Sequence, residues 1–128
     1  MFPLFPPPRS SFLDLLSFVG DRTKQFALRI VRLYSVLPQK TEAQVIGKQL
    51  LRSGTSTGAH YREATRARSP AEYISKISGG LQELEESIYW IELLVEADII
   101  EKAKVEKLLQ EAEELTAILV TCINKAKK

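Results

Sequence analysis

Apolar residues recur three and four positions apart along most of the chain, which is the spacing of one face of an α-helix. This pattern predicts four amphipathic helices over about residues 21–36, 41–67, 70–97 and 101–125. No segment shows the strict alternation of a half-buried strand. Because the links between these helices are short, the pattern predicts an all-α fold, an antiparallel up-down-up-down four-helix bundle.

Local signals mark where the first two helices begin and end. Asp21 suits the N-cap of the first helix, and Pro38 ends it because the residue before a proline disfavours the α conformation. Thr41 and Gln44 have the spacing of a capping box at the start of the second helix. The predicted bundle therefore spans residues 21–128.

Residues 1–20 differ from the rest of the chain and form a separate leader. Its start holds four prolines, which exclude a helix there: Pro3, Pro6, Pro7 and Pro8. A short apolar cluster follows, too short to span a bilayer: Phe12, Leu13, Leu15, Leu16, Phe18 and Val19. No basic segment precedes this cluster, which argues against a secretory signal. The leader is interpreted either as mobile or as a strand or short helix docked on the bundle or a neighbouring chain.

The boundary between the second and third helices is the sharpest in the chain. Ser69 suits an N-cap, Pro70 the first helical position, and Glu72 the third position of a capping box. The turn is very short, so the two helices should lie side by side.

The third helix carries more apolar surface than one bundle position needs. One seam alternates by three and four: Ile74, Ile77, Leu81, Leu84, Ile88, Ile91 and Val95. A second row lies beside it at a spacing of seven: Tyr73, Gly80, Ser87 and Leu94. Further apolar side chains lie away from the seam: Tyr89, Trp90, Leu93 and Leu94. This surplus indicates a subunit interface anchored by Trp and Tyr; the alternative is a deeper core within one chain.

Seven small residues, 53–59, occupy the middle of the second predicted helix. Each glycine in a helix costs about 1 kcal/mol relative to alanine, so such a run suggests that another backbone comes close. Folding the third helix back places Gly58 near Gly79 and Gly80. We therefore expect Gly54, Gly58, Gly79 and Gly80 to let the second and third helices pack tightly.

Composition excludes several kinds of site. The 128 residues suffice for one domain and include one histidine and one cysteine, His60 and Cys122. A single cysteine cannot form an intrachain disulfide. One histidine and one cysteine are too few for the usual His/Cys zinc sites, and one histidine is too few for a bundle di-iron centre. The net charge is +2, but residues 1–70 hold 11 basic and four acidic side chains and residues 71–128 hold seven and 12. This asymmetry indicates a two-faced particle, or halves that attract each other within or between chains.

The helical faces away from the apolar stripes are expected to carry the charges in solvent. On the first helix these residues are Arg22, Lys24, Arg29 and Arg32. On the fourth helix they are Glu111, Glu113 and Glu114.

A basic cluster lies around the end of the second helix and is a candidate nucleic-acid contact: Arg52, His60, Arg62, Arg66 and Arg68. Tyr61 among them is available for stacking on a base. The alternative is a solvated helix end, where cations suit the dipole and Glu63 pairs with Arg66.

One catalytic arrangement is conceivable, with Ser56, His60 and Glu63 at helical spacing on one face. A helix-borne triad without an oxyanion hole is a poor catalyst. We therefore expect a protein that is not an enzyme and His60 as a partly buried polar residue.

Three stretches resemble the bacterial four helix bundle proteins, also called 23S rRNA-intervening sequence proteins. They are QLLRSGTSTGAHYREA (Gln49–Ala64), RARSPAEYISKI (Arg66–Ile77) and LQELEESIYWIELLVEA (Leu81–Ala97), within a likeness that covers residues 21–127. The family pattern of small residues followed by Gly-Ala-Asn and an acidic residue is matched here, except that His60 replaces the Asn.

The resemblance implies an antiparallel four-helix bundle, a ring-like homo-oligomer, in relatives a pentamer, and no established enzymatic activity. The accessory proteins of diversity-generating retroelements look similar; they are basic rings that bind nucleic acid and a reverse transcriptase. This chain is closer to neutral.

We expect a cytoplasmic, non-enzymatic assembly or scaffold protein whose partner is a second copy of itself. The alternative is a module that binds RNA or DNA through a basic surface at the turn between the second and third helices. We expect no cofactor, no metal, no membrane contact and no small-molecule substrate.

Overall fold

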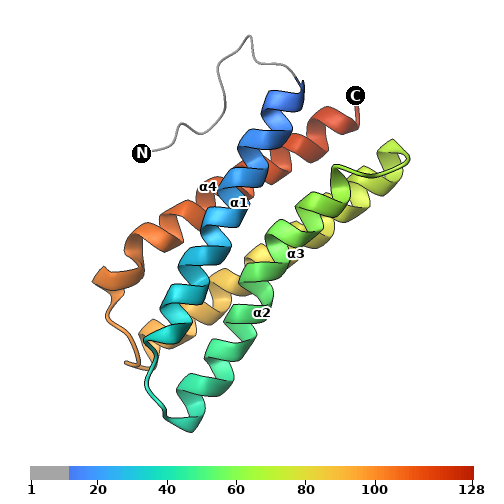
Figure 1. Cartoon of the computed structure of the whole chain (residues 1–128). Coiled ribbons are helices and arrows are strands. Elements are labelled where there is room, and N and C mark those ends of the chain that lie inside the picture. The colour runs from blue at the N-terminus through green and yellow to red at the C-terminus, as the bar shows by residue number, and fades with distance from the viewer. Residues whose placement is uncertain (1–11) are drawn as a thin grey trace.

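The computed structural model describes residues 12–128, which form four helices and no strand. The helices are α1 (Phe12–Ser35), α2 (Thr41–Ala64), α3 (Pro70–Glu96) and α4 (Lys102–Ala126). Consecutive helices run in alternating directions (Figure 1). The predicted all-α four-helix bundle is confirmed.

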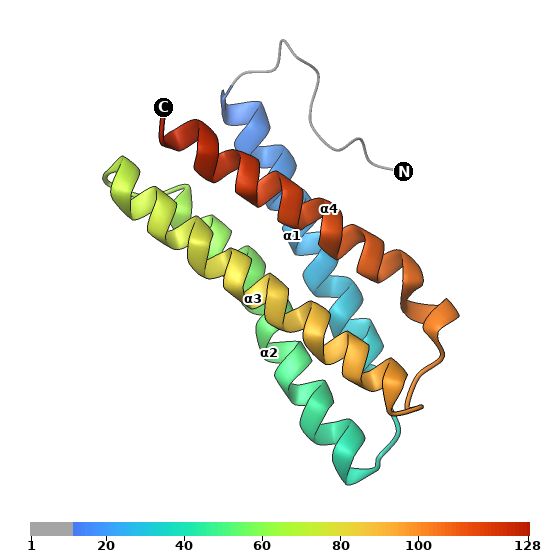
Figure 2. The same ribbon diagram turned by 180° about the vertical axis from the view of Figure 1, so that it is seen from behind.

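The helices pack in chain order around a closed square, with α1 against α2, α2 against α3, α3 against α4 and α4 against α1. The α2–α3 pair is the most extensive and the α1–α4 pair the least. The α1 and α2 helices form one side of the bundle (Figure 1), and α3 and α4 form the opposite side (Figure 2).

The first helix begins nine residues earlier than Asp21, so the predicted start was wrong. Val19 is fully buried, and Leu15, Leu16 and Phe18 pack against the core. These positions continue the apolar stripe of α1 toward its N-terminus. Residues 12–20 therefore belong to the bundle, in agreement with the docked-helix alternative for the leader. The prolines of the predicted leader lie outside the described residues.

The centre of the buried face of α3 runs between the two predicted rows. It is formed by Ile77, Gly80, Leu84, Ser87, Ile91 and Leu94. The other seam residues are half-buried: Ile74, Leu81, Ile88 and Val95. Leu94 has 0% exposure within the protomer, so its expected place in a subunit interface was wrong. The deeper-core alternative holds for this residue.

The glycines of α2 face α1. A Cβ on Gly54 would lie 2.7 Å from Ile30 Cγ1, and a Cβ on Gly58 would lie 3.3 Å from Thr23 Oγ1. Gly47 likewise lies against the side chain of Leu37, at 2.6 Å. The expectation that Gly58 faces Gly79 and Gly80 was wrong.

The glycines of α3 do face α2, but they meet other residues. A Cβ on Gly79 would lie 2.7 Å from His60 Cδ2, and one on Gly80 would lie 3.3 Å from the carbonyl oxygen of Thr57. The Ser53 and Ser87 hydroxyls, 2.8 Å apart, form a buried hydrogen bond across the same interface. The predicted close approach of these two helices is therefore real, although the pairing of glycines differs.

A buried ion pair joins α1 to α4. The side chain of Arg22 is 2% exposed. Its Nε donates to Glu111 Oε2 at 3.1 Å, its Nη2 donates to Glu111 Oε1, and the same nitrogen lies 3.4 Å from Glu114 Oε1. The expectation that these three side chains lie on solvent faces was wrong.

Burial alone would lower the pKa of Arg22. The hydrogen bonds and charges of Glu111 and Glu114 outweigh that effect and raise the pKa above its ordinary value. The guanidinium also lies over the ring of Phe18, 5.9 Å from its centroid. A paired charge therefore replaces apolar packing at this least extensive helix–helix interface.

The predicted cap of α3 is confirmed, because Ser69 Oγ accepts the Glu72 N–H at 3.1 Å. The Glu72 carboxylate accepts from the backbone N–H of Arg68. A standard capping box would use the N–H of the N-cap residue, Ser69. The predicted capping box of α2 was wrong, because Lys40 is the N-cap and makes no side-chain bond. Gln44 instead donates to the carbonyl of Pro38 at 2.9 Å and braces the preceding loop.

The link from α3 to α4 is a Schellman turn. The Ile99 N–H donates to the carbonyl of Leu94 and the Asp98 N–H to that of Val95, both at 3.0 Å. Asp98 has a φ of 58°, the left-handed conformation that glycine usually supplies at this position. The turn satisfies the last carbonyls of α3 without a glycine.

We expect Glu111→Gln to lower the free energy of unfolding by about 2–3 kcal/mol, because it leaves the buried Arg22 charge without a full counter-charge. Urea unfolding followed by circular dichroism, at one fixed protein concentration, measures the change. The matched control is Glu113→Gln on the exposed side of α4, expected to change stability by less than about 0.5 kcal/mol. Equal effects would contradict the structural role of the pair.

We expect Gly54→Ala to lower the free energy of unfolding by about 1–3 kcal/mol, because the new methyl collides with Ile30. The matched control is Gly20→Ala in α1, where a Cβ would meet, among the described residues, only Tyr61 Cε2, at 3.8 Å. That variant gains helix propensity and should be neutral or up to about 1 kcal/mol more stable. Stabilisation by Gly54→Ala would show that the close α1–α2 approach is not required.

Candidate binding site between α1 and α2

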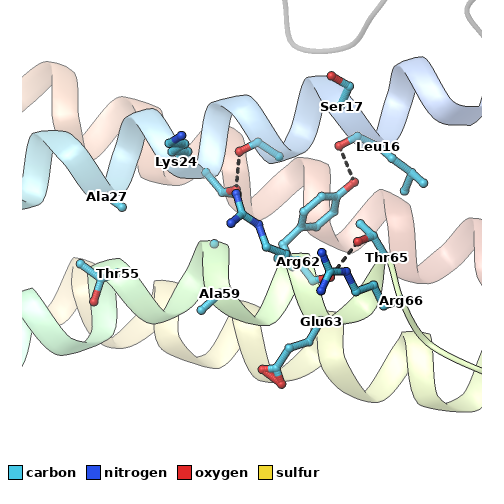
Figure 3. A pocket seen from close by; sticks show the side chains of 14 residues that line it. Leu16, Ser17, Lys24, Ala27, Thr55, Ala59, Arg62, Glu63, Thr65 and Arg66 are labelled. Atoms are coloured by element: carbon cyan, nitrogen blue, oxygen red, sulfur yellow. Dashed lines mark hydrogen bonds between the residues drawn. The ribbon is translucent and has the colours of Figure 1, made fainter.

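A surface groove of about 830 Å³ lies between the N-terminal half of α1 and the C-terminal half of α2. Small residues from both helices form half of its lining: Ser17, Gly20, Thr23, Ala27, Thr55, Gly58 and Ala59. It is hollow because these helices approach through small residues that do not fill the space between them. Figure 3 shows the groove from close by.

Three cations border the groove, Lys24 from α1, Arg62 from α2 and Arg66 just after α2 (Figure 3). Within residues 12–128 none of the three forms an ion pair. Glu63, the acidic residue among the described lining, is held by Lys76 of α3 at 3.0 Å. The hydrogen bond and charge of Lys76 lower the pKa of that carboxyl. The groove therefore presents uncompensated positive charge over a floor of small side chains.

Tyr61 fixes one end of the groove. It is 2% exposed, and its hydroxyl donates to the carbonyl of Leu16 at 3.1 Å, which ties the start of α1 to α2. Burial raises the pKa of Tyr61 far above its usual range. The ring is therefore a neutral structural element and is not available for base stacking.

The five predicted nucleic-acid residues do not form one surface. Arg62 and Arg66 border the groove, whereas Arg52 reaches across to α3, with Nη1 2.9 Å from Glu83 and Nη2 3.3 Å from Glu86. Arg68 is 91% exposed at the α2–α3 turn, 4.0 Å from Glu72. His60 lies against Gly79 of α3.

Lys24 and the α1 wall of the groove were missed by the sequence analysis. The signal was present, because Ser17, Gly20, Lys24 and Ala27 recur at helical spacing. It was hidden by the interpretation of residues 1–20 as a separate leader.

The conceivable catalytic arrangement is not formed, because the side chains of Ser56, His60 and Glu63 form hydrogen bonds with other groups and not with one another. Ser56 Oγ donates to the carbonyl of Arg52 at 2.7 Å, and His60 Nδ1 is 2.9 Å from the carbonyl oxygen of Ser56. Glu63 accepts from Lys76, and the alternative pair of Glu63 with Arg66 is not formed within residues 12–128. This geometry offers no activated serine.

A second candidate surface lies on the outer side of α3. Tyr89 is 55% exposed and meets Trp90 edge to face, with the ring centroids 5.1 Å apart. The Trp90 indole nitrogen is buried without a hydrogen-bond partner in the described residues. Both rings border a shallow hollow of about 580 Å³ with Gln82, Glu85 and Glu86. Leu93 beside them is half-buried.

In the part of the chain that the structure describes, no three His, Cys, Asp or Glu side chains gather closely enough to hold a metal ion. Over the same residues no helix combines the length and apolar character that a membrane crossing requires.

Comparisons with known proteins place the chain in a family. A search among curated proteins found no match. A solved structure of a protein of unknown function from the S23 ribosomal protein family of Bacteroides thetaiotaomicron VPI-5482 is similar, with 38% identity and a TM-score of 0.80. The similarity covers 85% of this chain and 97% of that one. The family model described as 23S rRNA-intervening sequence protein matches residues 18–121. The chain therefore belongs to the 23S rRNA-intervening sequence protein family.

Proposed function

We propose that this protein is a non-enzymatic assembly protein that acts as a homo-oligomer. The observation that carries the proposal is the aromatic pair of Tyr89 and Trp90 on the outer side of α3. Tyr89 is not one of the buried core residues, and its large side chain is exposed to solvent. Tyrosine and tryptophan are among the residues that most often anchor protein interfaces.

Two further features support this proposal. The Ser56 and His60 side chains are engaged with backbone carbonyls, which gives no support to hydrolysis. Other large apolar side chains are exposed on α1, the α1–α2 link and α4: Leu28, Val31, Val36 and Val120. The family resemblance adds a ring, in relatives a pentamer, as the expected form of the assembly.

Light scattering on the size-fractionated protein tests the assembly. We expect a mass that is a multiple of the 14.4 kDa protomer at about 10 μM, and five times that mass for a pentamer. Tyr89→Ala should raise the dissociation constant at least about tenfold, because it removes the anchor. The matched control is Val45→Ala, which removes a similarly exposed apolar side chain from α2. A monomer at this concentration would reject the proposal.

A second function, binding of structured RNA or DNA, is favoured by the cations Lys24, Arg62 and Arg66, which lack ion-pair partners in the described residues. By contrast, three other arginines each pair with a glutamate: Arg22, Arg52 and Arg68. Phosphates are the natural partners of such uncompensated cations. The family name refers to an insert in ribosomal RNA, which makes RNA the first nucleic acid to test.

Fluorescence anisotropy with a labelled RNA hairpin, from about 50 to 300 mM salt, measures this binding. We expect Arg62→Ala to weaken binding and to reduce the salt slope by about one, as for one lost phosphate contact. Arg52→Ala is the matched control, because Arg52 is already paired with Glu83 and Glu86. Absence of binding at the lowest salt would rule out this function.

A further inference from the structure

We propose that the α1–α2 groove of one copy receives the outer edge of α3 of a second copy. In this contact the groove cations meet Glu85 and Glu92, and Tyr89 enters the groove. The inference rests on the proposed homo-oligomer and names the two surfaces that build it.

The groove has the shape of a receptor for a large side chain. Its lining includes Gly20, Ala27, Gly58 and Ala59, small residues that leave space at the surface between the two helices. Its volume of about 830 Å³ is within the range of well-formed ligand pockets. Among the described lining residues, three carry a positive charge, and the negative charge of Glu63 is already compensated by Lys76.

The outer edge of α3 has the complementary character. Glu85 and Tyr89 border the same hollow one helical turn apart, and Glu92 is exposed one turn further on. Within residues 12–128 neither Glu85 nor Glu92 forms an ion pair. The neighbouring Glu83 and Glu86, on the flank toward α2, are the ones held by Arg52. The unpaired acids therefore flank the exposed aromatic ring.

The charge of the whole bundle follows the same division. The helices α1 and α2 together hold seven basic and four acidic residues, whereas α3 and α4 hold five and ten. These two pairs form opposite sides of the protomer (Figures 1 and 2). Opposite potentials on opposite sides favour a front-to-back contact between copies.

A contact between two different surfaces is heterologous, so each copy uses its groove for one neighbour and its α3 edge for another. Such contacts close into a ring when the rotation between copies permits it. A two-fold dimer would instead need one surface that matches itself. The distribution of charge thus favours a heterologous contact over a two-fold dimer.

A nucleic acid in the groove would satisfy the cations alone. It would leave the exposed Tyr89 and the unpaired Glu85 and Glu92 on the opposite side without a partner. A second copy satisfies both sets at once, and is therefore the occupant that the structure favours.

Charge reversal with the full-length protein tests the contact. The groove variant is Arg62→Glu with Arg66→Glu, the edge variant is Glu85→Lys with Glu92→Lys, and a swapped variant carries all four changes. Sedimentation velocity should show the dissociation constant raised about 100-fold in the groove and edge variants. The swapped variant should return to within about tenfold of the wild-type value, because its charges again match.

The matched control reverses two exposed cations at the start of α4, at the end of the bundle away from the groove, Lys102→Glu with Lys104→Glu, and should associate as the wild type does. Circular dichroism melting of each variant identifies any loss of folding, and recovery in the swapped variant cannot arise from misfolding.

The outcomes separate the two proposals. A monomeric wild type rejects the assembly function itself. An oligomeric wild type whose mass is unchanged in both reversal variants leaves that function standing and overturns the groove–edge contact. Dissociation by only one of the two variants, or failure of the swapped variant to reassociate while folded, also overturns it. Dissociation of the wild-type assembly by nuclease shows that nucleic acid, and not α3, occupies the groove.

Discussion

The close approach of α2 to both of its neighbours is the constraint on which the rest of the bundle depends. One side of α2 carries Gly47, Gly54 and Gly58 against α1, and the other side carries Ser53 and Thr57 against α3. Bulky residues at these positions would push two helices away at once. The small-residue run therefore allows the close packing of α1, α2 and α3, and α4 completes the core.

The same constraint produces the groove on the surface. Helices that meet through glycine and alanine bring their backbones close but leave little side-chain bulk at the edge of the contact. Between α1 and α2 this edge forms the groove. Arg62 and Arg66 border the groove because they follow the small-residue run along the chain. Where α1 meets α4, the contact is less extensive, and the Arg22–Glu111 pair joins the helices instead. The close α1–α2 contact thus leaves a groove at the surface, whereas the less extensive α1–α4 contact holds a buried ion pair.

Periodicity and local caps were sufficient to predict the helices and their order, because these depend on neighbours in sequence, as at Ser69 and Glu72. The start of α1 was misjudged because Gly20 and Asp21 look like a boundary, and only packing of Val19 in the core overrides that signal. Burial of Arg22 could not be predicted, because its partner is 89 residues away. The direction in which Gly58 faces depends on rotation of α2 about its axis, which two neighbouring helices decide jointly. One wall of the groove is therefore formed partly by residues before Asp21, which the sequence pattern had assigned to a separate leader.

The hydrogen bond from Tyr61 to the carbonyl of Leu16 gives the groove an unusual thermodynamic property. One wall consists of the N-terminal half of α1, and helix ends open more readily than helix centres. Any occupant that touches this wall stabilises the closed helix by mass action, so occupancy and local folding are linked equilibria. The Tyr61 hydroxyl thus couples folding of the first turns of α1 to occupancy of the α1–α2 groove.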